Sequence, residues 1–233
     1  MGISACLLAY KEAENLRALL PQVHAALKET GEEHEIIVVD TQTPLDDTAD
    51  VCREQGARYV NQEEPHFGGA FRTAIRHASL DTFLIMDADG SHKPEYIAPI
   101  HKLFARGADV VIGSRYVRGG KTQDSALSVA MSKILNRAYR WCLGIKAKDI
   151  STNFRMYRTE QLKNVNIRND HYDVLQEVLF MLKRANPALD IRETPITFDK
   201  RMFGESKRRL LPFVFSYMRT LFRLMGMRLR GRE

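Results

Sequence analysis

Phe83-Leu-Ile-Met-Asp-Ala-Asp-Gly-Ser91 is the stretch of this chain that decides its fold. Its apolar run Phe83–Met86, bounded by turn-forming residues, is typical of a strand buried on both faces of a sheet. Asp87 and Asp89 follow directly, so the carboxyl end of that strand presents two carboxylates one residue apart. Ligands of open α/β sheets bind beyond the carboxyl ends of strands, and two carboxylates there can share a divalent cation.

Three further apolar runs end on polar residues in the same way. They are Ile3–Tyr10, followed by Glu12; Glu35–Asp40; and Asp109–Gly113, followed by Arg115. Helical patterns lie between the runs, at Ala13–Glu29, Asp46–Gln55, Gly69–Ser79 and Pro94–Arg106. Strand and helix alternating at this pace predict βαβ units. The expected fold class is therefore α/β, a mainly parallel sheet flanked by helices, with the four strand ends facing one crevice.

Composition bounds the class of protein. With 233 residues and 44% hydrophobic residues, the chain can build one substantial core. Its three cysteines are far apart and form no C-x-x-C pair, which favours a reduced intracellular compartment. No signal peptide and no apolar stretch of about 18 residues is visible, so we expect a cytoplasmic protein.

The positive charge is concentrated at the end of the chain. Residues 200–233 hold ten Lys and Arg against Glu205 and Glu233, a net +8, so the remainder of the +6 chain sums to −2. Such a basic segment indicates an acidic partner surface. Nucleic-acid binding would require basic residues interleaved with stacking aromatics over a broad face, and we therefore expect no nucleic-acid partner.

The second half of the chain continues with mixed elements. The patterns predict a helix at Ala126–Leu143, a loop leading into a strand at Lys148–Arg158, a helix at Tyr172–Ala185, a strand at Leu189–Phe198 and a charged loop at Asp199–Lys207. A last helix, Leu210–Arg230, carries an apolar stripe flanked by arginines. Two interpretations stay open: a helix packed on the core, or an interfacial helix on anionic lipid, which the dense arginine supply favours.

The order of short motifs resembles the family 2 glycosyltransferases, most closely the dolichol-phosphate mannosyltransferases and their bacterial polyprenyl-phosphate relatives. The motifs are Ala9-Tyr-Lys-Glu12, Val38-Val-Asp40, Phe67-Gly-Gly-Ala70, Met86-Asp-Ala-Asp89, Gly113-Ser-Arg-Tyr116, Asp149 with Phe154-Arg-Met-Tyr157, Gln176-Glu177 and Gly204-Glu-Ser-Lys207. The resemblance implies a GT-A (Rossmann-like) domain over residues 1–207, followed by a basic amphipathic membrane-interface helix over 208–233.

The resemblance also implies roles for individual residues. Asp87 and Asp89, with Ser91, would hold Mg²⁺ or Mn²⁺, and Arg115 and Ser132 would bind the acceptor phosphate. Arg201 and Lys207 would close over the donor. The implied catalytic set is Asp87, Asp89, Arg115 and Arg201. The implied nucleotide-binding set is Ala9, Tyr10, Glu12, Val39, Asp40, Asp87, Ala88, Asp89, Arg201 and Lys207.

The reaction that this resemblance implies is inverting transfer of a hexose, GDP-mannose being the favoured donor, to a polyprenyl or dolichyl phosphate. It would take place on the cytoplasmic membrane face, with a separate membrane-anchoring protein as a possible partner. A phosphate monoester is already anionic near neutral pH and needs no general base, so catalysis would depend on positioning and charge neutralisation.

Departures from the family pattern keep alternatives open. Thr41, Leu45 and Asp47 alter the nucleotide loop, which leaves a UDP-sugar donor possible. Ser128 stands where an arginine is expected, and Asn153 where a glycine is common. A soluble acceptor would require a carboxylate base, for which Asp149 and Glu177 are the candidates. A non-catalytic binder of membrane or nucleic acid is the remaining alternative.

Overall fold

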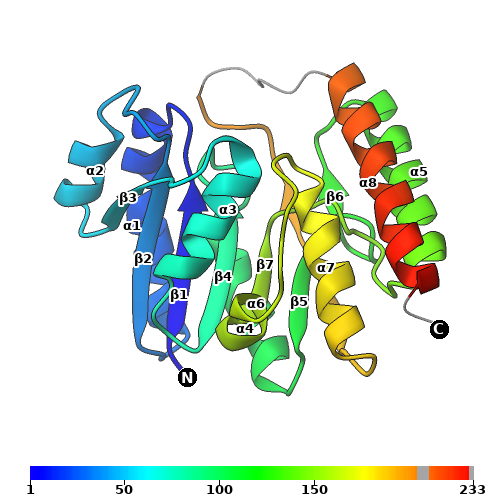
Figure 1. Ribbon diagram of the computed structural model, residues 1–233. Coiled ribbons are helices and arrows are strands. Elements are labelled where there is room, and N and C mark those ends of the chain that lie inside the picture. The colour runs from blue at the N-terminus through cyan, green and yellow to red at the C-terminus, as the bar shows by residue number, and fades with distance from the viewer. Residues whose placement is uncertain (204–209, 231–233) are drawn as a thin grey trace.

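The apolar runs of the sequence form the centre of a seven-stranded sheet in the computed structural model, which describes residues 1–203 and 210–230 (Figure 1). The strand order is β3-β2-β1-β4-β7-β5-β8. The bounds are β1 (Ile3–Leu8), β2 (His34–Asp40), β3 (Arg58–Asn61), β4 (Thr82–Asp87), β5 (Val110–Ser114), β7 (Arg155–Arg158) and β8 (Ile191–Pro195). Neighbouring strands are parallel except at β7, which runs antiparallel between β4 and β5.

The four strands expected in the first half are confirmed, with small shifts at their ends. The sequence reading missed β3, a short and partly exposed edge strand, and it did not place β7 inside the sheet. The strand expected at Leu189–Phe198 is wrong as a single element, because the chain leaves the large sheet after β8. Its last two residues form β9 (Thr197–Phe198), which pairs with β6 (Lys121–Thr122).

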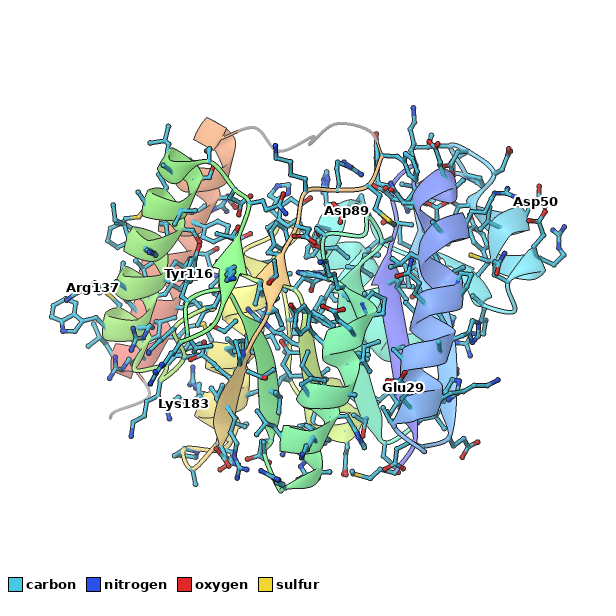
Figure 2. The ribbon with its side chains drawn as sticks, turned by 180° about the vertical axis from the view of Figure 1, so that it is seen from behind. Glu29, Asp50, Asp89, Tyr116, Arg137 and Lys183 are labelled. Atoms are coloured by element: carbon cyan, nitrogen blue, oxygen red, sulfur yellow. The ribbon has the colours of Figure 1, made fainter. Side chains whose placement is uncertain are left out.

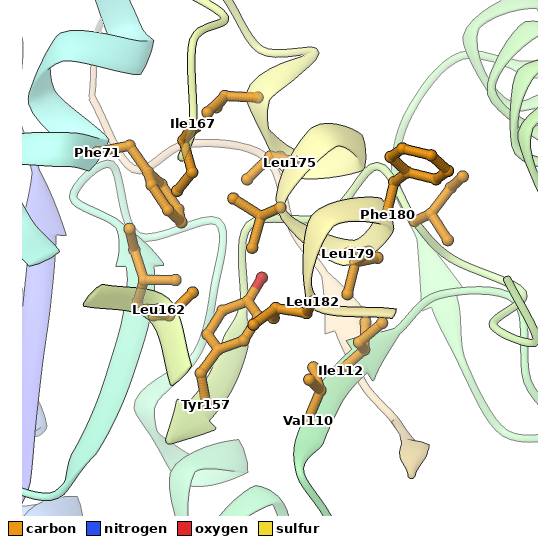
Figure 3. Packing of buried hydrophobic residues seen from close by; sticks show 14 of the residues in the cluster. Phe71, Val110, Ile112, Tyr157, Leu162, Ile167, Leu175, Leu179, Phe180 and Leu182 are labelled. Carbon is orange, nitrogen blue, oxygen red and sulfur yellow. The ribbon is translucent and has the colours of Figure 1, made fainter. Parts of the chain in front are cut away.

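Helices cover both faces of the sheet, and each face has its own core. One layer contains α1 (Ala13–Glu29), α2 (Thr48–Glu54), the 3₁₀ turn η1 (Pro94–Tyr96) and α4 (Ile97–Ala105). The other contains α3 (His66–His77), α6 (Thr159–Lys163) and α7 (Val174–Ala185). Successive strand side chains alternate between the faces, so Leu7 joins the first core and Cys6 the second. Figure 3 shows the second core, where α7 packs over β5 and β7.

Two long helices, α5 (Ala126–Leu143) and α8 (Leu210–Arg230), lie side by side at the end of the molecule away from α2 (Figure 1). Both were predicted with these bounds. The Tyr139 hydroxyl of α5 donates to the Tyr217 carbonyl of α8, and Arg228 donates to the Cys142 carbonyl at the end of α5. Leu221 and Leu224 are buried against the core. The core-packing interpretation of the last helix is therefore confirmed for this inner side.

Two glycines allow the loops above the sheet to take their positions. Gly90 has a φ of +78°, which a residue with a side chain rarely adopts, and it lets the chain turn directly after Asp89. At Gly68, a Cβ atom would lie 1.9 Å from the Asn169 carbonyl oxygen, so only glycine permits this contact of α3 with the loop before α7. The carboxyl ends of β1, β2, β4 and β5 share one edge, where these loops meet.

Candidate functional site

The turn after β4 orients the second carboxylate of the Asp87-Ala-Asp89 motif. Asp89 Oδ1 accepts the backbone N–H of Ser91 at 3.0 Å and its hydroxyl at 2.6 Å. Ser91 is buried, so its hydroxyl fixes the carboxylate of Asp89; its role as a metal ligand stays a prediction. Figure 2 shows Asp89 at the edge of the sheet where the strands end.

Asp87 is held by groups that are distant in the sequence. The Asn153 side-chain amide donates to Asp87 Oδ1 at 3.0 Å. His92 Nδ1 accepts the backbone N–H of Asp87 at 3.1 Å, so this nitrogen carries no proton. His92 Nδ1 also lies 3.7 Å from Asp87 Oδ2. Because this nitrogen carries no proton in this tautomer, the two atoms do not form a charged pair. Asn153 and His92 are both buried, and together they fix the position of Asp87.

The donor set of this turn fits a hard divalent cation that also binds a diphosphate. In the described ranges 1–203 and 210–230, no group of three or more His, Cys, Asp or Glu side chains gathers around one point. Asp87 and Asp89 both use Oδ1 for the hydrogen bonds above, and their Oδ2 atoms accept none from the described residues. Two carboxylate oxygens are an incomplete shell for Mg²⁺ or Mn²⁺, which phosphate oxygens and water can complete.

A buried carboxylate lies at the end of β2, on the other side of β1. Asp40 is fully buried, and the Tyr59 hydroxyl donates to its Oδ2 at 3.1 Å. Burial raises the pKa of Asp40, and the hydrogen bond from Tyr59 opposes this in part. Asp40 Oδ1 has no hydrogen-bond partner in the described part of the chain. A buried acceptor of this kind requires an explanation, and an N–H of a bound base would provide one.

Other members of the implied nucleotide-binding set surround this position. Ala9, Val39 and Ala88 have buried side chains, so a bound nucleotide could meet only their backbone. Tyr10 is 49% exposed at the end of β1 and can offer its ring to a base. Lys207, the last member of the set, lies outside the described residues.

Glu12 and Arg201 contact each other directly. Arg201 Nη2 lies 2.5 Å from Glu12 Oε1, and Asn15 Nδ2 donates to Glu12 Oε2. Burial raises the pKa of Glu12, while Arg201 and Asn15 act against this rise. Asn15 also accepts the backbone N–H of Phe203 at 3.0 Å. The segment after β9 is thereby fixed over the start of α1, and the Met202 N–H reaches the Asp89 carbonyl at 2.9 Å.

Arg115, at the end of β5, is anchored by a second buried carboxylate. Its Nε lies 2.7 Å from Asp149 Oδ2, and its Nη2 lies 2.9 Å from Asp149 Oδ1. Burial alone would raise the pKa of Asp149, but the charge and hydrogen bonds of Arg115 outweigh burial and lower it. Arg115 Nη2 also donates to Ser151 at 2.8 Å, and Ser151 contacts Ser132 at 3.1 Å. The two implied phosphate ligands, Arg115 and Ser132, are therefore brought together.

A cavity of about 440 Å³ connects Arg115 to Asp87. Its polar part includes both residues together with Ser132, Ser151 and Asn153. Its apolar part is lined by α5, α7 and α8, through Leu127, Met131, Leu135, Leu175 and Tyr217. One cavity thus joins the D-x-D turn to an apolar wall beside the two long helices.

Neither carboxylate proposed as a general base is available for that role. Asp149 is fully buried in its ion pair with Arg115. Glu177 is buried as well: its Oε2 accepts the backbone N–H groups of Arg168 and Asn169, and its Oε1 pairs with Arg223 of α8. Glu177 therefore does not lie on a solvated helix face. Both groups organise the structure.

The sequence reading missed three residues of the site, namely His92, Asn153 as a partner of Asp87, and Asp124. Asp124 lines the cavity just before α5. A histidine directly after Ser91 could have pointed to the first. The other two have no signal in the sequence, because their partners are set by the placement of β7 and by the β6–β9 pairing.

Comparisons with known proteins agree with this geometry. The family model described as "Glycosyl transferase family 2" matches residues 4–165. A dolichol-phosphate mannosyltransferase of Pyrococcus furiosus is 31% identical over 97% of this chain, which spans 64% of that protein's length. An undecaprenyl-phosphate mannosyltransferase of Micrococcus luteus is 32% identical over 89% of this chain and 87% of its own. A polyprenol monophosphomannose synthase of Mycolicibacterium smegmatis is 30% identical over 85% of this chain and 77% of its own.

Solved structures show the same fold. Glucosyl-3-phosphoglycerate synthase of Mycobacterium tuberculosis, in complex with Mn²⁺, UDP and phosphoglyceric acid, superposes with a TM-score of 0.73 at 18% identity. The match covers 97% of this chain and 78% of that one. A complex of the same synthase with Mg²⁺ and UDP gives a TM-score of 0.72, again at 18% identity, with 97% and 79% of the two chains covered.

Proposed function

The chain belongs to glycosyl transferase family 2, and from this premise we propose that it transfers a hexose from a nucleotide sugar, GDP-mannose first among the donors, to a polyprenyl phosphate at a membrane surface. The observation that carries the proposal is the cavity that runs from Asp87 past Arg115 to the apolar wall of α5. Such a cavity suits an acceptor with an anionic head and an apolar chain.

The donor half of the proposal rests on the D-x-D turn. The Oδ2 atoms of Asp87 and Asp89 accept no hydrogen bond from the described residues, so both would be available to a cation on a nucleotide diphosphate. A bound Mg²⁺ or Mn²⁺ would act as a Lewis acid that stabilises the departing diphosphate. Asp40 Oδ1 would accept an N–H of the base, and the Glu12–Arg201 pair would lie beside the ribose and phosphates.

The acceptor half rests on charge and on the burial of Asp149 and Glu177, the two carboxylates considered as a base. Arg115 and Ser132 would hold the phosphate of the acceptor, and its oxygen would attack the sugar from the face opposite the leaving diphosphate. This attack inverts the anomeric centre. A phosphate oxygen needs no proton removed at neutral pH, which agrees with the burial of Asp149 and Glu177 in ion pairs. An alcohol acceptor would need a base in their place.

The surface of α5 and α8 supports a location at a lipid surface. Three apolar side chains of α5 and three of α8, each set spaced by two helical turns, are between 64% and 85% exposed: Leu127, Ile134, Trp141, Phe215, Phe222 and Leu229. Exposed basic side chains accompany them, namely Lys133, Arg137, Arg219 and Arg230. Apolar residues with a cationic flank suit the boundary of an anionic membrane. Figure 2 shows Arg137 on the outer side of α5.

The two-helix face, formed by the exposed apolar side chains of α5 and α8, is larger than the segment that the sequence assigned to the membrane. The sequence reading placed only residues 208–233 there, whereas α5 contributes as many exposed apolar side chains as residues 215–230 of α8, whose side chains the structure describes. Within the part of the chain that the structure describes, no helix is long and apolar enough to cross a bilayer. A separate membrane-anchoring partner would bind near the same face.

A donor screen tests the proposed function. The purified protein is incubated with Mg²⁺ or Mn²⁺, a polyprenyl phosphate, and labelled GDP-mannose, UDP-glucose or UDP-N-acetylglucosamine in separate reactions. We expect lipid-linked product, most of it from GDP-mannose. Product from a UDP-sugar alone would change the proposed donor and leave the proposed acceptor unchanged. The absence of lipid-linked product with all three donors would contradict the proposal.

A further inference from the structure

Asp124 is a cavity-facing carboxylate that the proposed reaction does not use. It lies between β6 and α5, and its Oδ2 is 3.4 Å from Arg115 Nη1. The Thr122 hydroxyl donates to the same oxygen at 2.9 Å. Among the described residues the Asp124 carboxylate therefore has two partners, and the contact with Thr122 is the shorter.

The two carboxylates around Arg115 differ in how firmly they are held. Asp149 makes two short contacts, at 2.7 Å and 2.9 Å, and its side chain is completely buried. Asp124 makes one long contact, and its side chain is 35% exposed. A bidentate buried pair is much stronger than a single contact near solvent. Of the two, only Asp124 can leave Arg115 at small cost.

Geometry places Asp124 where an acceptor phosphate has to bind. Nε and Nη2 of Arg115 face Asp149 and Ser151, so Nη1 is the nitrogen that remains for a ligand in the cavity. Asp149 already balances the charge of Arg115, and Asp87 and Asp124 add two negative charges to the cavity lining. A phosphate that meets this wall is repelled while Asp124 stays at Nη1.

We propose that Asp124 is a displaceable counter-ion of Arg115: it holds Arg115 Nη1 until the phosphate of the acceptor replaces it there. The inference rests on the proposed function and identifies how the acceptor phosphate gains access to Arg115. A phosphate can compete with a carboxylate for a guanidinium N–H, whereas a neutral hydroxyl cannot.

The surrounding backbone allows this exchange by rotation of one side chain. The Lys121 N–H donates to the Ile196 carbonyl at 2.9 Å, and Gln123 Nε2 donates to Asp199 at 2.8 Å, which fixes the strand before Asp124. Ser125 caps α5 by accepting the backbone N–H of Ser128. With both sides fixed, the Asp124 carboxylate can turn away from Arg115 and keep its bond to Thr122.

The test compares Asp124→Asn with wild type, and uses Asp81→Asn as the matched control, because Asp81 is an exposed carboxylate at the opposite end of β4. Asparagine can still accept the Thr122 hydroxyl, and thermal melting checks that each variant folds. The acceptor KM is measured with a short-chain prenyl phosphate at saturating donor and metal. The Kd of the same prenyl phosphate is measured by calorimetry without donor.

We expect the KM and Kd of Asp124→Asn to fall about five- to tenfold, with kcat little changed and with a smaller difference at high salt. The control should match wild type. An equal or higher acceptor KM in Asp124→Asn would overturn the inference even if wild type forms lipid-linked product. Tighter binding of prenyl phosphate by Asp124→Asn, with no product from any donor, would support the counter-ion and reject the proposed function.

Discussion

Arg115 and Asp149, 34 positions apart in the chain, form a buried bidentate ion pair that joins the end of β5 to the loop before β7. The pair orients the guanidinium so that Nη1 faces the cavity. Exposed ion pairs of the same chain, such as Arg17 with Glu54 at 3.1 Å, have no comparable role. The position of the proposed acceptor site therefore depends on this pair.

Asp149→Asn should destabilise the protein by about 3–5 kcal/mol, since it leaves a buried guanidinium without its counter-charge. Glu54→Gln, which removes an exposed partner, should cost less than about 1 kcal/mol. Urea unfolding at neutral pH measures both changes. Equal effects of the two substitutions would show that the buried pair does not anchor this region.

The same pair predicts a pH dependence of stability. Because Arg115 lowers the pKa of Asp149 in the folded state, the stabilisation is present above the unfolded pKa of about 3.9 and is lost as the pH falls through the folded value. Wild type should thus lose stability below about pH 4 more steeply than Asp149→Asn. Unfolding curves at stepwise lower pH measure this, and parallel loss in both proteins would contradict the prediction.

Asp89→Asn should reduce turnover at least about 100-fold and leave the melting temperature nearly unchanged. The asparagine oxygen can still accept the hydrogen bonds from Ser91, so the turn should persist. The variant lacks the negative charge that would bind the cation. Asp50→Asn, on the exposed side of α2 far from Asp89 (Figure 2), is the control. Full activity of Asp89→Asn, or turnover that EDTA does not affect, would refute the metal role.

The sequence predicts the frame of this fold well but not its long-range contacts. The runs that became β1, β2, β4 and β5 have strong apolar patterns, and α1, α5 and α8 show helical periodicity over four turns or more. β7 has only four residues and no periodic pattern, so its insertion between β4 and β5 could not be seen. The Asn153–Asp87 hydrogen bond follows from that insertion.

The same limit applies to the site. The positions of Asp87, Asp89 and Arg115 followed from strand ends, which the sequence reveals. The burial of Asp149 and Glu177 depends on partners 34 and 46 residues away, and an isolated carboxylate in the sequence looks the same whether it is a base or half of an ion pair. Likewise, the sequence alone does not show which side of α5 faces outward. The exposure of Trp141 follows from how α5 packs beside α8.

Replacing Trp141 and Phe222 by serine should weaken binding to anionic vesicles by about 1.5–3 kcal/mol per side chain that the lipid buries. Both are surface residues, whereas deleting Pro212–Glu233 would also remove the buried Tyr217 and Leu224 and disturb the core. Leu45→Ser, an exposed leucine elsewhere, is the control. Co-sedimentation with anionic and neutral vesicles measures the change. Unaltered sedimentation of the double variant would contradict the two-helix membrane face.

Arg201→Ala should raise the donor KM about tenfold without changing the acceptor KM, because the proposed function places the Glu12–Arg201 pair beside the donor nucleotide. Without Arg201, the buried Glu12 loses the cation that opposes its raised pKa. Lys200→Ala, an exposed neighbour, is the control. Steady-state kinetics with each substrate varied in turn give both constants. A change confined to the acceptor KM would contradict the prediction and assign Arg201 to the acceptor site.

The most direct test of the central claim compares a polyprenyl phosphate with the corresponding unphosphorylated polyprenol as acceptor, under the same donor and metal. If the phosphate supplies the nucleophile, labelled sugar from GDP-mannose should appear only on the phosphate-bearing lipid, because neither Asp149 nor Glu177 can deprotonate an alcohol in the cavity. Equal transfer to the polyprenol, or to a soluble sugar, would contradict the account.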